Sequence, residues 1–147
     1  MKKDFYEEIE KSIEGLIGDL HDSTWDKVRQ RYFNHLKENL KFPFTVSGIE
    51  DFRWEEFFVL GPGDEEEYEE LKQTQPSYTD IFILVSIDDK QNSEWMLNPY
   101  EDIAAIVKRE SDGKNFVLGL SELEASNKRT KNYRILYGYS YCFCNYR

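Results

Sequence analysis

The residues of this sequence that are best suited to chemistry are carboxylates, and they fall into two groups. Asp19, Asp22 and Asp26 precede and enter a segment with helical periodicity, and Glu122 and Glu124 alternate in an apolar segment. Hard divalent cations such as calcium take six to eight oxygen ligands from carboxylates, carbonyls and water. These five acids are therefore the candidate metal ligands, and calcium is the candidate ion.

A purely structural role stays open for both groups. Aspartates in front of a helix also cap its first turn and stabilise its dipole, and acids on a strand can simply face solvent. Residues two apart on a strand point to one face, so we expect Glu122 and Glu124 to reach one ion together. Either group alone offers few oxygens, so we expect a weak site that water completes.

Other catalytic resources are sparse in this sequence. It contains no glycine-rich phosphate loop, no H-E-x-x-H motif and no G-x-S-x-G motif. Its two histidines, His21 and His35, and its two cysteines, Cys142 and Cys144, match no zinc-ligand spacing. We therefore expect a protein that is not an enzyme.

The charge balance points to cationic partners. The chain has 19 Lys and Arg against 29 Asp and Glu, a formal net charge of −10. Nucleic-acid binding needs clustered positive charge, so we expect no nucleic-acid partner. Six acids lie within Asp64–Glu70. They favour an alternative function, a protein-interaction module of the immunity or inhibitor type, which would set its acidic face against a basic protein.

Hydropathy bears on location. The longest apolar runs are far shorter than the 18 residues that a membrane span needs, so we expect no membrane partner. The first residues lack the apolar core of a secretory signal. We therefore expect a cytoplasmic protein.

The periodicity of apolar residues changes near Pro43. Residues 4–17 and 24–40 repeat apolar positions every three or four residues and predict two helices. Pro43 cannot continue a helix. Beyond it, short apolar runs predict strands, an acidic stretch predicts a helix, and the last segment fits a strand or a short helix. The expected strands are 45–49, 57–60, 78–87, 102–109 and 115–120, the acidic helix is 64–73, and the last segment is 133–146.

These elements predict an α+β fold in which two N-terminal helices pack on a small, curved, mainly antiparallel β-sheet or barrel. We expect one domain over residues 1–147, with a helical part at 1–41 and a β-rich part at 42–147. Phe42 and Phe44, at the junction, are expected to bury both rings in the core.

Two blocks of the sequence are similar to a known family. Residues 32–44 form an aromatic helix that ends in Leu40-Lys41-Phe42-Pro43-Phe44, and residues 115–124 resemble the strand motif V-P-L-x-D-L-E. Both resemble the CcbP-type calcium-binding proteins, small acidic domains of cyanobacterial type. The resemblance implies a non-enzymatic cytoplasmic protein that binds calcium through surface carboxylates. It also implies that the second helix starts beside the strand block and that the acidic stretch near 50–77 is an insertion.

Overall fold

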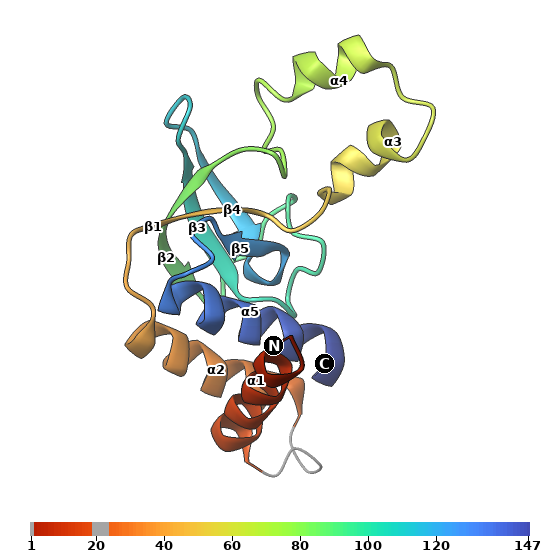
Figure 1. Ribbon diagram of the computed structural model, residues 1–147. Helices are drawn as coiled ribbons and strands as arrows, with labels where there is room; N and C mark the ends of the chain where they lie inside the picture. Colours follow the sequence, from red (N-terminus) through yellow and green to blue (C-terminus); the bar gives the residue numbers. More distant parts are fainter. Residues whose placement is uncertain (1, 19–23) are drawn as a thin grey trace.

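Five antiparallel strands form an open sheet in the order β4-β3-β2-β1-β5 (Figure 1). The computed structural model describes residues 2–18 and 24–147. Within this part of the chain β4 and β5 are the two sheet edges. The sheet is therefore open, and the barrel that was the alternative prediction does not form. The strands are β1 (Phe44–Gly48), β2 (Phe82–Asp88), β3 (Ala104–Arg109), β4 (Asn115–Gly119) and β5 (Leu123–Ala125).

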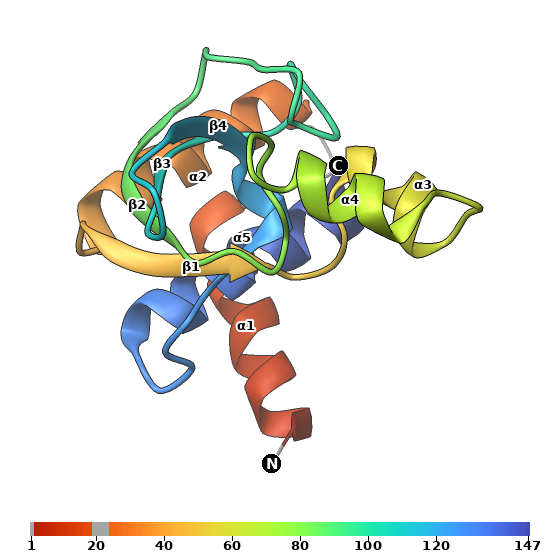
Figure 2. The same ribbon diagram turned by 90° about the horizontal axis from the view of Figure 1, so that it is seen from above.

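Three long helices lie together on one side of the sheet (Figures 1 and 2). The helices α1 (Lys2–Ile17) and α2 (Trp25–Asn39) are the two that periodicity predicts, and the α+β class is confirmed. Thr24 caps α2, accepting a hydrogen bond from the main-chain nitrogen of Lys27 at 3.4 Å. The third helix, α5 (Lys131–Tyr146), packs against β5 and the turn η3 (Leu120–Glu122).

The last segment is a helix of 16 residues, longer than the strand or short helix expected. Its aromatic content suits a strand, but tertiary packing decides against one. Leu136, Tyr139 and Phe143 are buried at spacings of three and four residues, so one helical face covers the core. The helical layer on the sheet is therefore built from both ends of the described chain.

The junction between helices and sheet differs from the expectation in one respect. Phe42 and Phe44 are only half-buried, and their ring centroids lie 5.9 Å apart at the margin of the core. Val46 is fully buried on the same strand as Phe44. The strand's interior position is therefore filled by Val46, and the prediction that both phenyl rings lie within the core is wrong.

Residues 50–77 project away from the sheet as a lobe (Figures 1 and 2). It holds the 3-10 turn η2 (Arg53–Glu55) and the helices α3 (Glu56–Val59) and α4 (Glu65–Leu71). The predicted acidic helix is confirmed as α4. The predicted strand over residues 57–60 is wrong, because this run lies in and just after α3 and pairs with no described strand.

A buried carboxylate fixes the base of the lobe. Glu55 is fully buried and accepts hydrogen bonds from the main-chain nitrogens of Tyr78 (2.8 Å) and Phe52 (3.3 Å). The hydroxyls of Ser77 and Tyr68 also donate to it, at 2.8 and 2.5 Å. Four donors around one carboxylate satisfy its lone pairs, so this acid is structural.

A buried arginine fixes the other end of the lobe. Arg109 on β3 pairs with Asp80 at 3.0 Å and with Asp112 at 2.8 Å. It also donates to main-chain carbonyls that follow α4, including Gln73 (2.8 Å) and Gln75 (2.9 Å). The turn after α4 is thus tied directly to the sheet.

Candidate cation site

The first acidic group lies mostly outside the described residues. Asp19 and Asp22 are in the segment 19–23, which the structure does not describe. Asp26 lies in the first turn of α2, where its exposed carboxylate pairs with Arg29 at 3.4 Å. An acid at this position with this ion pair stabilises the first turn of the helix, which was the structural alternative to metal binding for Asp26.

The start of α2 contacts the segment that leads into β3. The Trp25 indole nitrogen donates to the Glu101 carbonyl at 2.6 Å, and Arg29 donates to the Tyr100 carbonyl at 2.5 Å. The next residue along the chain is Asp102. The start of the second helix therefore lies beside the segment that carries Asp102, a residue that the sequence analysis did not select.

The second acidic group does not sit on one strand. Glu122 ends the turn η3, and Glu124 lies in β5, opposite Ser47 of β1. The chain turns after Gly119 before it joins β1, so the alternation of a continuous strand does not apply. Glu122 and Glu124 therefore do not lie on one strand as expected, and their reaching one ion together stays a prediction.

Glu122 lies close to another acid, Asp102, which is deeply buried. Asp102 is 2% exposed and precedes β3. Its Oδ1 accepts a hydrogen bond from the Tyr139 hydroxyl at 2.7 Å, and its Oδ2 accepts one from the Ser121 hydroxyl at 2.5 Å. The Ser121 main-chain nitrogen lies 3.2 Å from both oxygens. Helix α5 and the turn η3 therefore hold this carboxylate in place together.

Gly119 allows the two carboxylates to approach each other. A Cβ atom at this position would lie 2.4 Å from Glu122 Oε2 and 2.6 Å from Asp102 Oδ2. The two oxygens are thus roughly 5 Å apart or closer, within the range where like charges disturb each other. Glu122 Oε2 also accepts a hydrogen bond from the Leu97 main-chain nitrogen at 3.2 Å.

Burial raises the pKa of both acids, and the charge of Asp102 adds to the shift of Glu122. Burial raises the pKa of Asp102 to about 6, against the opposing effect of its hydrogen bonds from Ser121 and Tyr139. Burial also raises the pKa of Glu122 to about 7, and the charges of Asp102 and Glu50 add to that shift. Among the described residues, no basic side chain lies within ion-pair distance of either carboxylate.

A cavity of about 480 Å³ opens beside this pair. Its lining includes three further acids and two neutral oxygen donors, from the base of the lobe, the loop before β3 and helix α5. Ser140 contributes a buried hydroxyl that has no hydrogen-bond partner in the described part of the chain. The acids are Glu50, Asp51 and Glu56, and the neutral oxygen donors are Asn98 and Ser121.

The chemistry that this arrangement supports is cation binding. Carboxylates, an amide and hydroxyls lie around the pair, among apolar side chains and Arg147, and such oxygen donors are ligands for hard cations. Among the residues described, no three acidic, histidine or cysteine side chains are already placed to hold one ion together. A bound cation would therefore draw on the pair first, with water and a rearranged neighbour completing its shell.

One solved structure matches this chain over most of its length. No family model and no curated protein matches it. The match is to the crystal structure of Anabaena CcbP, with a TM-score of 0.56 and 15% sequence identity, covering 92% of this chain and 89% of the other. The chain has the fold of Anabaena CcbP. At 15% identity, the likeness to CcbP establishes the fold alone.

Within this CcbP fold, Glu122 is among the site residues that the sequence predicts, whereas Asp102 and Gly119 are not. Asp102 and Glu122 are 20 positions apart and meet only because β3 and β4 form a hairpin that returns the chain. The available signal was a single aspartate at the start of an apolar run, where a solvated residue is the usual expectation.

No described helix is long and apolar enough to cross a membrane.

Proposed function

We propose that this protein binds calcium without catalysing a reaction and that the Asp102–Glu122 pair forms the centre of the site. The observation that carries the proposal is the close approach of the buried Asp102 carboxylate and the half-buried Glu122 carboxylate beside Gly119. Two ionised carboxylates at this separation repel each other in a medium of low dielectric constant. A divalent cation between them removes that repulsion. Among the described residues, no basic side chain lies close enough to do the same.

The neighbouring oxygens suit a site of modest affinity. Glu122 faces the cavity, and Asn98 and the unpartnered hydroxyl of Ser140 line it. Glu50 is exposed, so its side chain is free to turn toward an ion. Calcium takes six to eight oxygens, and a site with two or three carboxylates completed by water binds in the range of about 10⁻⁴ to 10⁻³ M.

The family resemblance supports the same function. The blocks at residues 32–44 and 115–124 resemble the CcbP-type calcium-binding proteins, and the second block ends in Glu122 and Glu124. The shared fold with Anabaena CcbP is consistent with that resemblance. The resemblance supports a non-enzymatic, cytoplasmic calcium-binding protein.

A thermal-shift experiment tests this proposal with a matched pair of variants. Glu122→Gln removes the charge at the pair, and Glu124→Gln makes the same change on β5. Calcium at about 5 mM should raise the melting temperature of the parent and of Glu124→Gln, because it binds the folded state. It should have little effect on Glu122→Gln, and magnesium should act more weakly. Equal shifts in both variants would remove the pair from the site.

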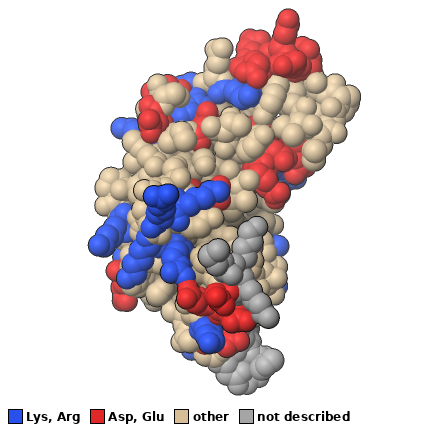
Figure 3. All heavy atoms as spheres, viewed as in Figure 1, with Lys and Arg blue, Asp and Glu red and all other residues tan. Residues whose placement is uncertain are grey.

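A second candidate function is the binding of a basic protein by the lobe. The observation that favours it is the mixed character of the lobe's surface. Phe57 and Leu60 are 56% and 78% exposed, and acidic side chains cluster on α4 (Figure 3). Capture of a host protein at low salt, lost when the α4 glutamates become glutamines, would support this function. Capture unaffected by those changes would exclude α4 from it.

A further inference from the structure

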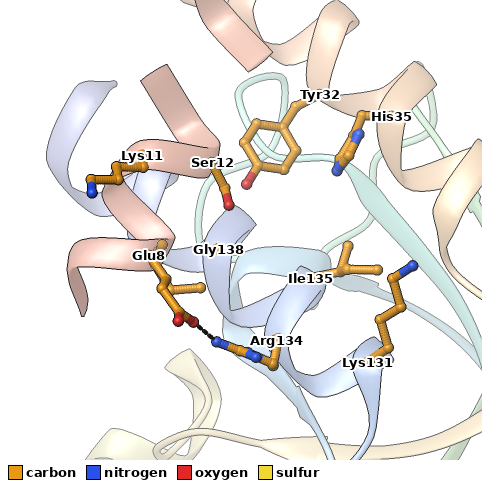
Figure 4. Close-up of a pocket in the computed structure, with 10 residues that line it drawn as sticks. Glu8, Lys11, Ser12, Tyr32, His35, Lys131, Arg134, Ile135 and Gly138 are labelled. Atoms are coloured by element: carbon orange, nitrogen blue, oxygen red, sulfur yellow. Dashed lines mark hydrogen bonds and ion pairs between the residues drawn. The ribbon is translucent and has the colours of Figure 1, made fainter. Parts of the chain in front are cut away.

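A second cavity, of about 430 Å³, lies between α1, α2 and α5 (Figure 4). It shares no lining residue with the cavity beside Glu122. Its surroundings carry the opposite charge, because three basic residues line it from α1 and α5 against one acid, Glu8. These basic residues are Lys11, Lys131 and Arg134.

The basic side chains differ in their orientation. Arg134 turns toward Glu8 and forms an ion pair with it, and Lys11 points away from the cavity (Figure 4). Lys131, in the first turn of α5, has no ion-pair partner among the described residues. Lys and Arg side chains also gather on the face shown in Figure 3. Lys131 is therefore the cation available to a ligand, and Glu8 is already neutralised.

Two hydroxyls face the same space. Figure 4 shows the Tyr32 and Ser12 hydroxyls directed toward the opening between the helices. Neither forms a hydrogen bond within the described part of the chain. Gly138 lets the Tyr32 hydroxyl lie close to α5, because a Cβ atom there would be 2.9 Å from the hydroxyl oxygen. Both hydroxyls remain available as donors to a ligand.

His35 contributes another donor. The side-chain nitrogen of Asn39 donates to the His35 carbonyl at 2.8 Å and lies 3.1 Å from His35 Nδ1. An amide nitrogen can only donate, so His35 Nδ1 accepts and the proton of the neutral ring sits on Nε2. Burial lowers the pKa of this histidine, which favours the neutral ring. The imidazole therefore presents an N–H group.

We propose that this cavity binds a small organic anion. Its phosphate or carboxylate group would accept hydrogen bonds from Lys131, His35 Nε2 and the hydroxyls of Tyr32 and Ser12. Its apolar body would pack against the aliphatic side chains that complete the lining, which are Ile9 and Ile135. A volume of about 430 Å³ falls within the range of small-molecule sites.

Calorimetric titration with three anions at constant ionic strength tests this proposal. Phenyl phosphate and benzoate combine an apolar ring with an anionic group, and inorganic phosphate carries the charge alone. We expect saturable binding of at least one aromatic anion, tighter than that of inorganic phosphate. Comparing the affinities of phenyl phosphate and benzoate identifies the preferred anionic group. Benzyl alcohol, the neutral control, should not bind. No saturation up to about 10 mM, or equal binding of benzyl alcohol, would overturn the proposal.

Two matched variants place the binding in this cavity. Lys131→Gln should weaken binding about tenfold, because it removes a charge-assisted hydrogen bond. Lys128→Gln makes the same change at an exposed position outside the cavity and should bind like the parent. Both variants should keep the parent's melting temperature, since both residues are exposed. Equal affinities of the two variants would show that the anion binds elsewhere and contradict the proposal.

Discussion

Asp102 and Glu122 each place a carboxylate oxygen against Gly119, 2.6 and 2.4 Å from the position that a Cβ atom there would take. A side chain at position 119 would collide with both oxygens, so the arrangement of the pair requires the glycine. The pair lies where the β3–β4 hairpin, the turn η3 and the core-facing side of α5 come together. Its acids are held by neutral donors, which fix their positions without neutralising their charge.

The first prediction concerns Gly119. Gly119→Ala should lower the free energy of unfolding by about 1–3 kcal/mol, because the new methyl group must displace at least one carboxylate. It should also abolish any stabilisation by calcium. Gly15→Ala is the control, since a Cβ atom there meets nothing within 4 Å and the helix interior favours alanine. Urea unfolding measures both, and a parent-like Gly119→Ala would contradict the crowding described.

The second prediction concerns pH. The folded-state pKa values of Asp102 and Glu122, about 6 and about 7, lie above their ordinary values of 3.8 and 4.5. The folded protein therefore holds protons that the unfolded chain releases, so their contribution to stability falls as pH rises from about 4 to about 7. Glu122→Gln should reduce that fall and be the more stable protein at about pH 8. Urea unfolding across this range measures it. A parallel pH profile for parent and variant would contradict the assignment.

The third prediction concerns the anchor of the lobe. Arg109→Met should lower the free energy of unfolding by about 1–3 kcal/mol, because the main-chain carbonyls of Gln73 and Gln75 and the half-buried carboxylate of Asp80 lose their donor. Arg129→Met, at an exposed position, should change it by less than about 0.5 kcal/mol. Denaturant unfolding followed by circular dichroism measures both. Equal effects would mean that Arg109 does not tie the lobe to the sheet.

Periodicity in the sequence predicts the elements whose burial follows a simple repeat. The buried residues Val28, Tyr32 and Leu36 recur every four positions, and α2 forms where that repeat predicts it. The strand prediction for residues 57–60 is wrong because an apolar tetrapeptide suits a strand as well as a helical turn. Only the lack of a pairing strand among the described residues, a tertiary feature, decides between a strand and a helical turn.

The candidate site could be predicted only in part for a related reason. Glu122 stood out because it alternates with Glu124 in a recognisable block. Asp102 did not, because its importance comes from burial against Tyr139 and from a glycine 17 positions away. Glu55 and Arg109 escaped prediction in the same way, since charged residues are usually exposed and only the fold supplies their partners.

The measurement that tests the central claim most directly is a calcium titration by calorimetry at about pH 6.5, repeated in buffers of different ionisation enthalpy. Near the pKa values of the pair, calcium must displace a proton, so the observed heat should depend on the buffer. We expect saturable binding with proton release in the parent and in Glu124→Gln, and neither in Glu122→Gln. Absence of saturable calcium binding by the parent at millimolar concentrations would contradict the proposed function, and binding without proton release would contradict the proposed site.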